Sequence, residues 1–217
     1  IGFSAVVASF ILLYPSIAPL LGEVLPDSEW AYQESGIRDL QGEGTFGEGV
    51  RVCIVDTGID PSHPDFTHLE ISGFRDFYFE NSEAIRDIGS DSHGTLMAGL
   101  LVGNGTFTGA APEVSLSVAI ALGPTGKSAN EKMVSQAIRW CRISQEADII
   151  SLSLGSGAEN GGTSSSETSE AVREALSEGI FVVAAAGNFD LQSNNSDVSS
   201  PASIPGVIAV GAHGRGG

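Results

Sequence analysis

Three polar residues stand at the ends of apolar segments, where side chains that do chemistry are often found. Asp56 and Asn188 each end an apolar run, and His93 precedes another. In open α/β sheets, reactive groups lie just past the carboxyl ends of the strands. We therefore expect these three side chains to converge at one edge of a sheet.

Together the three side chains would supply three of the four parts of an acyl-transfer site. A buried Asp accepts a hydrogen bond from one imidazole nitrogen, which fixes the tautomer and stabilises the imidazolium. The other nitrogen can then take a proton from a nucleophile, and an Asn amide can donate to a developing oxyanion. Alone, Asp56 also fits a turn and His93 a helix cap, so the argument depends on their combination.

The elements that would position these residues alternate between strand and helix. Apolar runs bounded by Gly predict five strands and an outer strand or hairpin, at 50–56, 114–122, 148–154, 180–186, 207–211 and 71–79. Helical spacing predicts helices at 29–36, 130–142 and 170–178, the last one capped by Gly179. Segment 96–102 is apolar on nearly every face, which predicts a buried helix. This order predicts an α/β fold in three layers, a doubly wound, mostly parallel sheet with helices on both faces.

Composition limits the classes of partner. The 217 residues suffice for one domain with a sizeable core, and the formal net charge is −17, from 27 acidic and 10 basic residues. Nucleic-acid phosphates would repel such a surface, so we expect no nucleic-acid partner. The charge suits either a salt-rich habitat or an ordinary acidic secreted protein. Cys53 and Cys141 make no disulfide framework and lack metal-ligand spacing, so we expect two free buried thiols.

The amino-terminal segment differs from the rest. Residues 3–21 carry no charge and are mostly apolar, long enough to cross a membrane or to form the apolar core of a signal peptide. Pro15 and Pro19 weaken a spanning helix. We expect residues 1–22 to be a signal segment, a membrane anchor or the remnant of a pro-segment, and residues 23–217 to form the folded domain.

Five segments, in chain order, resemble motifs of the subtilisin-like serine proteases (subtilases). Residues 55–60 with the following His63-Pro64-Asp65 match the family's Asp motif, and 91–99 match its His motif. The other three look like its substrate-binding strand, its oxyanion-hole segment and the strand after it, at 151–155, 184–188 and 200–211. The resemblance implies that Asp56 orients His93, that His93 acts as general base and then acid, and that Asn188 stabilises the oxyanion.

The resemblance also implies a substrate cleft for a polypeptide. Three residues would hold the substrate backbone as an added strand, namely Ser153, Leu154 and Gly155. One wall of the side-chain pocket would be formed by Ala185, Ala186 and Gly187, whose small size leaves room for a sizeable apolar side chain. Gly123 and Gly126 would form the opposite edge of the cleft. The resemblance further predicts a cis peptide bond between Ser200 and Pro201. We also expect a monomer and, because of the apolar segment 3–21, a domain outside the cytoplasm, secreted or membrane-anchored.

The chain departs from the family pattern in its nucleophile. A Gly-Thr-Ser-Met-Ala-like motif is absent, and the sequence ends at Gly217, ahead of where that motif would come. We expect the serine to lie beyond Gly217, in a domain truncated at its carboxyl end, and the chain as given to be inactive. No cofactor is required. Calcium as a structural ion is left open, because Asp65 matches a common ligand but the ion needs 6–8 oxygens.

Three other readings compete. A non-catalytic, peptide-binding relative would keep the cleft without the serine. Segment 121–128 fits a relaxed P-loop pattern, which would cradle phosphates beside Lys127, but no later apolar strand ends in an Asp or Glu to hold magnesium. A metal site would need ligand spacing that the histidines lack. They stand at His63, His68, His93 and His213.

Overall fold

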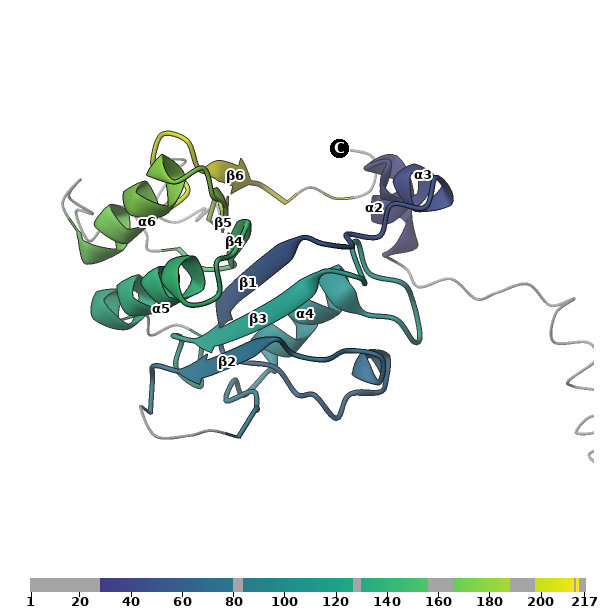
Figure 1. Cartoon of the computed structure of the whole chain (residues 1–217), viewed down its shortest axis with the longest axis horizontal. Coiled ribbons are helices and arrows are strands. Elements are labelled where there is room, and N and C mark those ends of the chain that lie inside the picture. Colours follow the sequence, from purple (N-terminus) through teal and green to yellow (C-terminus); the bar gives the residue numbers. More distant parts are fainter. Residues whose placement is uncertain are drawn as a thin grey trace, which may run out of the picture.

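A six-stranded parallel sheet is the framework of the molecule (Figure 1). The computed structural model describes residues 28–79, 84–126, 130–155, 166–187, 198–212 and 214. The strands lie in the order β2-β3-β1-β4-β5-β6, and each pairs with its neighbours in parallel. Their bounds are β1 Arg51–Asp56, β2 Gly73–Asp76, β3 Ser115–Ile120, β4 Ile149–Leu152, β5 Phe181–Ala185 and β6 Ile208–Val210. The predicted parallel α/β sheet is confirmed.

Strand β1 lies near the middle of the sheet, between β3 and β4. Its residues after Arg51 are all buried, as expected for a strand covered on both faces. Alternate side chains of a strand point to opposite faces. Val52 and Ile54 accordingly pack in one core cluster, and Cys53 and Val55 in another.

Helices cover both faces of the sheet (Figure 1). Ala98 and Val102 of α4, His93–Val102, pack in the cluster of Val52 and Ile54. Helix α5, Glu131–Ile143, and helix α6, Glu167–Ser177, contribute to the opposite cluster. The short elements are α2 Glu29–Glu34, α3 Ile37–Gly42 and the 3-10 helix η2 Pro64–Phe66. The three predicted layers are therefore present.

Helix α4 differs from its prediction, because it is not buried all round. Gly94, Thr95, Ala98 and Val102 are buried, whereas Leu96 and Leu100 are 59% and 44% exposed. Residues four apart lie on one face of a helix. The inward face is thus made by 94, 98 and 102, and the two leucines lie on the outward face.

The prediction of two free thiols is wrong. Cys53 of β1 and Cys141 of α5 form a disulfide with their Cα atoms 5.7 Å apart. Both were expected to be buried, and they are. Sequence reasoning did not show that the face of β1 carrying Cys53 is the face that α5 covers. The disulfide therefore ties the central strand to a helix 88 positions along the chain.

Two local predictions are confirmed and one stays open. The Ser200–Pro201 peptide bond is cis, and Gly179 after α6 has a φ of +84°, a left-handed conformation that suits Gly. Within the described ranges no helix has the length and apolar character needed to cross a membrane. Residues 3–21 lie outside those ranges, so the assignment of residues 1–22 stays a prediction.

Candidate active site

Asp56 and His93 meet at the carboxyl end of β1. The Asp56 carboxylate has no exposed surface. His93 Nδ1 lies 2.8 Å from Asp56 Oδ1 and 3.0 Å from Oδ2. An ionised carboxylate only accepts hydrogen bonds, so Nδ1 carries the proton that is shared with Asp56. The other nitrogen, Nε2, is then the basic one.

The electrostatic setting of Asp56 opposes its charge. Burial raises the pKa of Asp56 above its ordinary value, although hydrogen bonds from His93 and from the Thr57 backbone N–H, 2.7 Å from Oδ1, act in the opposite direction. The negative charge of Asp87 adds to the increase in pKa. Within the described residues, Asp56 forms no ion pair with Lys or Arg. Its charge is therefore available to stabilise an imidazolium.

His93 presents its free nitrogen at the surface. It is the first residue of α4, and its side chain is 35% exposed. In the part of the chain that the structure describes, Nε2 has no hydrogen-bond partner. The imidazole is thus oriented from one side and open on the other, as a general base must be.

Glycines bring the two elements together. An added Cβ on Gly94 would lie 2.1 Å from the Gly58 carbonyl oxygen, and one on Gly58 would lie 2.1 Å from the Arg86 carbonyl oxygen. Gly58 also has a φ of +120°, which L side chains rarely adopt. These contacts explain why Gly follows Asp56-Thr57 and why Gly follows His93. Without them the amino terminus of α4 could not approach the end of β1.

A further carboxylate, Asp87, joins the same region and was not singled out by the sequence. Its Oδ1 accepts a hydrogen bond from Thr57 Oγ1 at 2.7 Å, and its Oδ2 accepts one from the Thr95 N–H at 2.9 Å. Asp87 lies four positions before Asp91 in the same polar stretch, and only Asp91 falls within the segment that resembles the His motif. Only the folded arrangement identifies Asp87.

The residues expected to bind substrate lie along the same edge of the sheet. The segment 153–155 directly follows β4, and 186–187 directly follow β5. The two strands pair, with Leu152 opposite Ala184, and Ile54 of β1 lies opposite Ser151. The segments that follow β4 and β5 therefore lie at the carboxyl edge of the sheet, where Asp56 also lies. All of 153–155 and 185–187 are at least partly exposed, and Leu154 also packs against the core cluster of α5 and α6.

The other predicted residues have separate outcomes. Gly123 and Gly126 follow β3 and form a turn, with the Gly126 N–H donating to the Gly123 carbonyl at 2.8 Å. Strand β3 pairs with β1, and the two strands end at the same level, where Asp56 lies opposite Ile120. Asn188 lies outside the described residues, as do Lys127 and Ser128 of the P-loop pattern. The roles of these residues stay predictions.

Asp65 serves a loop contact. Its Oδ1 accepts hydrogen bonds from the backbone N–H and the hydroxyl of Thr106, at 2.8 and 3.0 Å. Among the described residues no group of three His, Cys, Asp or Glu side chains could hold a metal ion. The neighbours of Asp65 thus do not supply the several carboxylate oxygens that a calcium site favours. A structural calcium ion stays untested.

Comparisons with known proteins identify the family of the chain. The sequence model of the subtilase family (Peptidase S8) matches residues 47–215. The chain is 36% identical over 180 residues to the major intracellular serine protease of Bacillus subtilis (strain 168), and 38% identical over 176 residues to subtilisin E of the same strain. These matches cover 80% of this chain, but 54% and 43% of the two relatives, so the chain spans about half of their length.

A third relative and a solved structure extend the comparison. The chain is 34% identical over 185 residues to the minor extracellular protease Vpr of B. subtilis, covering 82% of this chain and 22% of that protein. The structure of the prenylagaramide maturation protease PagA superposes with a TM-score of 0.66 at 22% identity, over 83% of this chain and 59% of that one. That likeness supports the fold, and the matched sequence model and relatives show that this chain belongs to the subtilase family.

Proposed function

We propose that this chain provides the Asp–His part of a serine endopeptidase that hydrolyses peptide bonds. The observation that carries the proposal is the Asp56–His93 pair, with Nδ1 held 2.8 Å from a buried carboxylate and Nε2 unpartnered among the described residues. The relatives named as serine protease, subtilisin and extracellular protease support it.

In the proposed mechanism, His93 acts twice. Nε2 first takes the proton of a serine hydroxyl as the serine oxygen attacks the substrate carbonyl, and Asp56 stabilises the resulting imidazolium. The imidazolium then gives the proton to the leaving amine, and a water molecule, activated in the same way, hydrolyses the acyl-enzyme. We place the serine carboxyl-terminal to Gly217, and we assign the oxyanion contact to the side-chain amide of Asn188.

The substrate is proposed to be a polypeptide bound as an added strand. Parallel strands β4 and β5 end side by side, so the segments that follow them can flank an extended peptide. In this proposal 153–155 pair with the substrate backbone, 185–187 line the side-chain pocket, and Gly123 and Gly126 form the opposite edge. The domain acts as a monomer.

We also propose that the domain works outside the cytoplasm. The Cys53–Cys141 disulfide supports this location, because disulfides persist mainly in oxidising compartments. The relatives do not decide the question, since one is named intracellular and another extracellular. Residues 3–21 would then serve as a signal segment or an anchor.

The test uses the full-length protein and a fluorophosphonate probe that labels activated serines. We expect labelling of one serine carboxyl-terminal to residue 217, and loss of labelling with loss of peptide hydrolysis in His93→Ala. A control variant, Lys132→Ala, changes an exposed residue of α5 and should label as the wild type does. A folded full-length protein that binds peptides but neither labels nor cleaves would overturn the proposal, and would indicate the peptide-binding alternative.

A further inference from the structure

The helix that carries His93 begins without a cap of its own. The residue before it, Ser92, has a φ of 54° and a ψ of 38°, in the left-handed region, and its side chain makes no capping hydrogen bond. The first N–H groups of a helix have no partner within the helix. An N-cap side chain normally accepts one of them. Here those groups must find partners elsewhere.

Two residues from outside α4 provide these partners. The Gly94 N–H donates to Thr57 Oγ1 at 2.9 Å, and the Thr95 N–H donates to Asp87 Oδ2 at 2.9 Å. The Thr95 hydroxyl donates to the same carboxylate oxygen at 2.6 Å. The cap of α4 is therefore supplied by Thr57, which directly follows β1, and by Asp87, which lies six positions before His93 in the segment that leads into the helix.

The other oxygen of Asp87 points back to β1. Oδ1 accepts from Thr57 Oγ1 at 2.7 Å and from the Gly89 N–H at 2.8 Å. The Thr57 N–H in turn donates to Asp56 Oδ1. A continuous hydrogen-bonded path thus runs from the carboxylate of Asp56, through Thr57 and Asp87, to the first turn of α4.

We propose that Asp87 is a positioning residue for the Asp56–His93 pair. It caps α4 from outside and fixes the amino terminus of that helix, and with it the imidazole, relative to the end of β1. Asp87 acts through Thr57 and the backbone of α4. The inference rests on the proposed protease function, because positioning matters only if His93 transfers protons.

Asp87→Asn in the full-length protein is the direct test. One carboxylate oxygen becomes an NH₂ group, which cannot accept from either Thr95 or Thr57, so one side of the cap is lost. Misplacing a catalytic group by about 1 Å can cost roughly 10²-fold in rate. We expect kcat for peptide hydrolysis to fall by about that factor, with KM little changed.

A matched control is Asp60→Asn. This residue lies on the loop after β1, and its carboxylate accepts hydrogen bonds from the N–H and the hydroxyl of Ser62, at 2.9 and 2.7 Å. Its backbone N–H donates to Thr95 Oγ1 of α4 at 3.0 Å, and Asp60→Asn keeps that group. The same chemical change there should leave kcat near the wild-type value. An equal loss in both variants would overturn the specific role of Asp87.

A second pair of variants serves if Asp87→Asn fails to fold. Thr57→Val keeps the shape of the side chain and removes the hydroxyl that links Asp87 to Gly94, whereas Thr57→Ser keeps the hydroxyl. We expect kcat to fall in Thr57→Val and to stay near the wild-type value in Thr57→Ser. Equal kcat in these two variants would contradict the proposed path.

The proton on His93 Nδ1 gives a readout that does not require turnover. Held against Asp56, it should give a downfield ¹H resonance that persists in Asp60→Asn and Thr57→Ser, and that broadens or disappears in Asp87→Asn and Thr57→Val. A sharp resonance with normal kcat in Asp87→Asn would overturn the inference. An inactive wild type that showed the predicted resonance changes would refute the protease function alone.

Discussion

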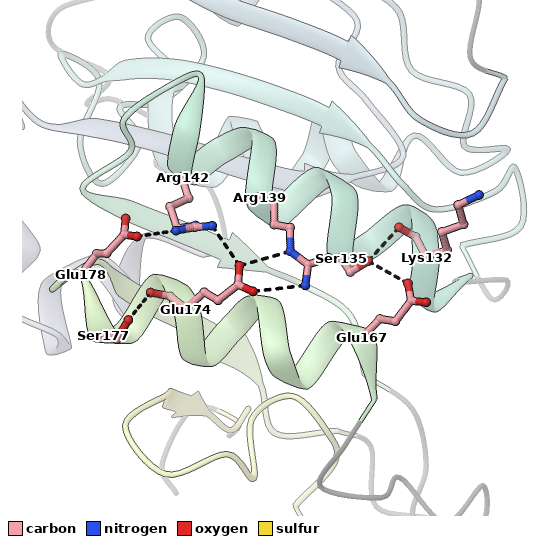
Figure 2. A network of polar contacts seen from close by, with 8 residues as sticks. All are labelled: Lys132, Ser135, Arg139, Arg142, Glu167, Glu174, Ser177 and Glu178. Carbon is pink, nitrogen blue, oxygen red and sulfur yellow. Dashed lines mark hydrogen bonds and ion pairs between the residues drawn. The ribbon is translucent and has the colours of Figure 1, made fainter.

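Two regions of the molecule hold carboxylates in opposite ways. At the end of β1, Asp56 is fully buried, and its hydrogen-bond donors are an imidazole and a backbone N–H. Between α5 and α6, Glu174 is partly exposed and accepts from two guanidinium groups, those of Arg139 at 3.1 and 3.3 Å and of Arg142 at 2.9 Å (Figure 2). Burial raises the pKa of Asp56, and the hydrogen bonds from Arg139 lower that of Glu174.

The difference separates a reactive carboxylate from a structural one. Arg142 also pairs with Glu178, so the seam between the two helices is a network of opposite charges (Figure 2). An arginine beside Asp56 would neutralise the charge that must stabilise an imidazolium. Burial of the charged Asp56 at the carboxyl edge of the sheet lowers the stability of the fold, whereas the arginines between α5 and α6 stabilise the charged form of Glu174.

His93→Ala is the largest predicted effect, because it removes the group that would move the proton. In the full-length protein we expect peptide hydrolysis to fall by roughly four to six orders of magnitude. The fold should persist, since the side chain is 35% exposed and its only hydrogen-bond partner among the described residues is Asp56. Steady-state kinetics measure the loss, and circular dichroism checks the fold. A folded variant with wild-type turnover would remove His93 from the mechanism.

Asp56→Asn tests the cost of the buried carboxylate as well as its role. The amide cannot stabilise the imidazolium, so we expect turnover to fall about 10⁴-fold. At neutral pH the variant should nevertheless be more stable than the wild type. Because the pKa of Asp56 is raised in the folded state, the proton-bound form favours folding. In the wild type, the contribution of protonated Asp56 to stability is fully present below the ordinary Asp pKa, and it is lost as the pH rises through the folded-state pKa.

Urea unfolding at two pH values separates these effects. The gain from Asp56→Asn should be largest at neutral pH and should shrink below the ordinary Asp pKa, where the wild-type carboxyl is protonated in both states. A variant that is less stable than the wild type at neutral pH would show that the hydrogen bonds from Thr57 and His93 outweigh burial.

The disulfide joins the two regions, because Cys53 is in β1 and Cys141 is in α5. Replacing both residues by Ala should lower the free energy of unfolding by about 2–5 kcal/mol. Reduction of the wild type should lower its stability by a similar amount, and should not affect the double variant. Chemical unfolding with and without reductant measures both. An equal response of the two proteins to reductant would contradict a disulfide between these residues.

The disulfide of Cys53 shows which features of the fold could not be predicted from the sequence. Apolar runs and Gly boundaries were enough to predict the strands and the parallel sheet, because these depend on local patterns. The pairing of Asp56 with His93 was predicted from the resemblance to the subtilases. The disulfide depends on which helix covers which face of the sheet. The exposure of Leu96 depends on how much of the surface of α4 is covered by other parts of the chain. Neither is a local property.

Asp87 was missed for a related reason. A carboxylate that reaches the first turn from several positions before the N-cap residue has no fixed spacing to the helix, whereas the N-cap residue does. The turn of Ser92 into the left-handed region leaves the cap position without a side-chain acceptor. The sequence Asp87-Ile-Gly-Ser-Asp91 offered two acidic residues before His93, and only the structure shows which one bonds α4.

Glu174→Gln is the smallest predicted effect and completes the comparison. The ion pairs with Arg139 and Arg142 are partly exposed, so we expect a loss of less than about 1 kcal/mol in the free energy of unfolding. Because the pKa of Glu174 is lowered in the folded state, its contribution is present above the ordinary Glu pKa and is lost as the pH falls through the folded-state value. The wild type and the variant should therefore become equally stable in acid. A double variant with Asp56→Asn should show additive changes, since the two carboxylates share no partner within the described ranges. Strong coupling between the two substitutions would mean that the helix seam and the end of β1 are not independent regions.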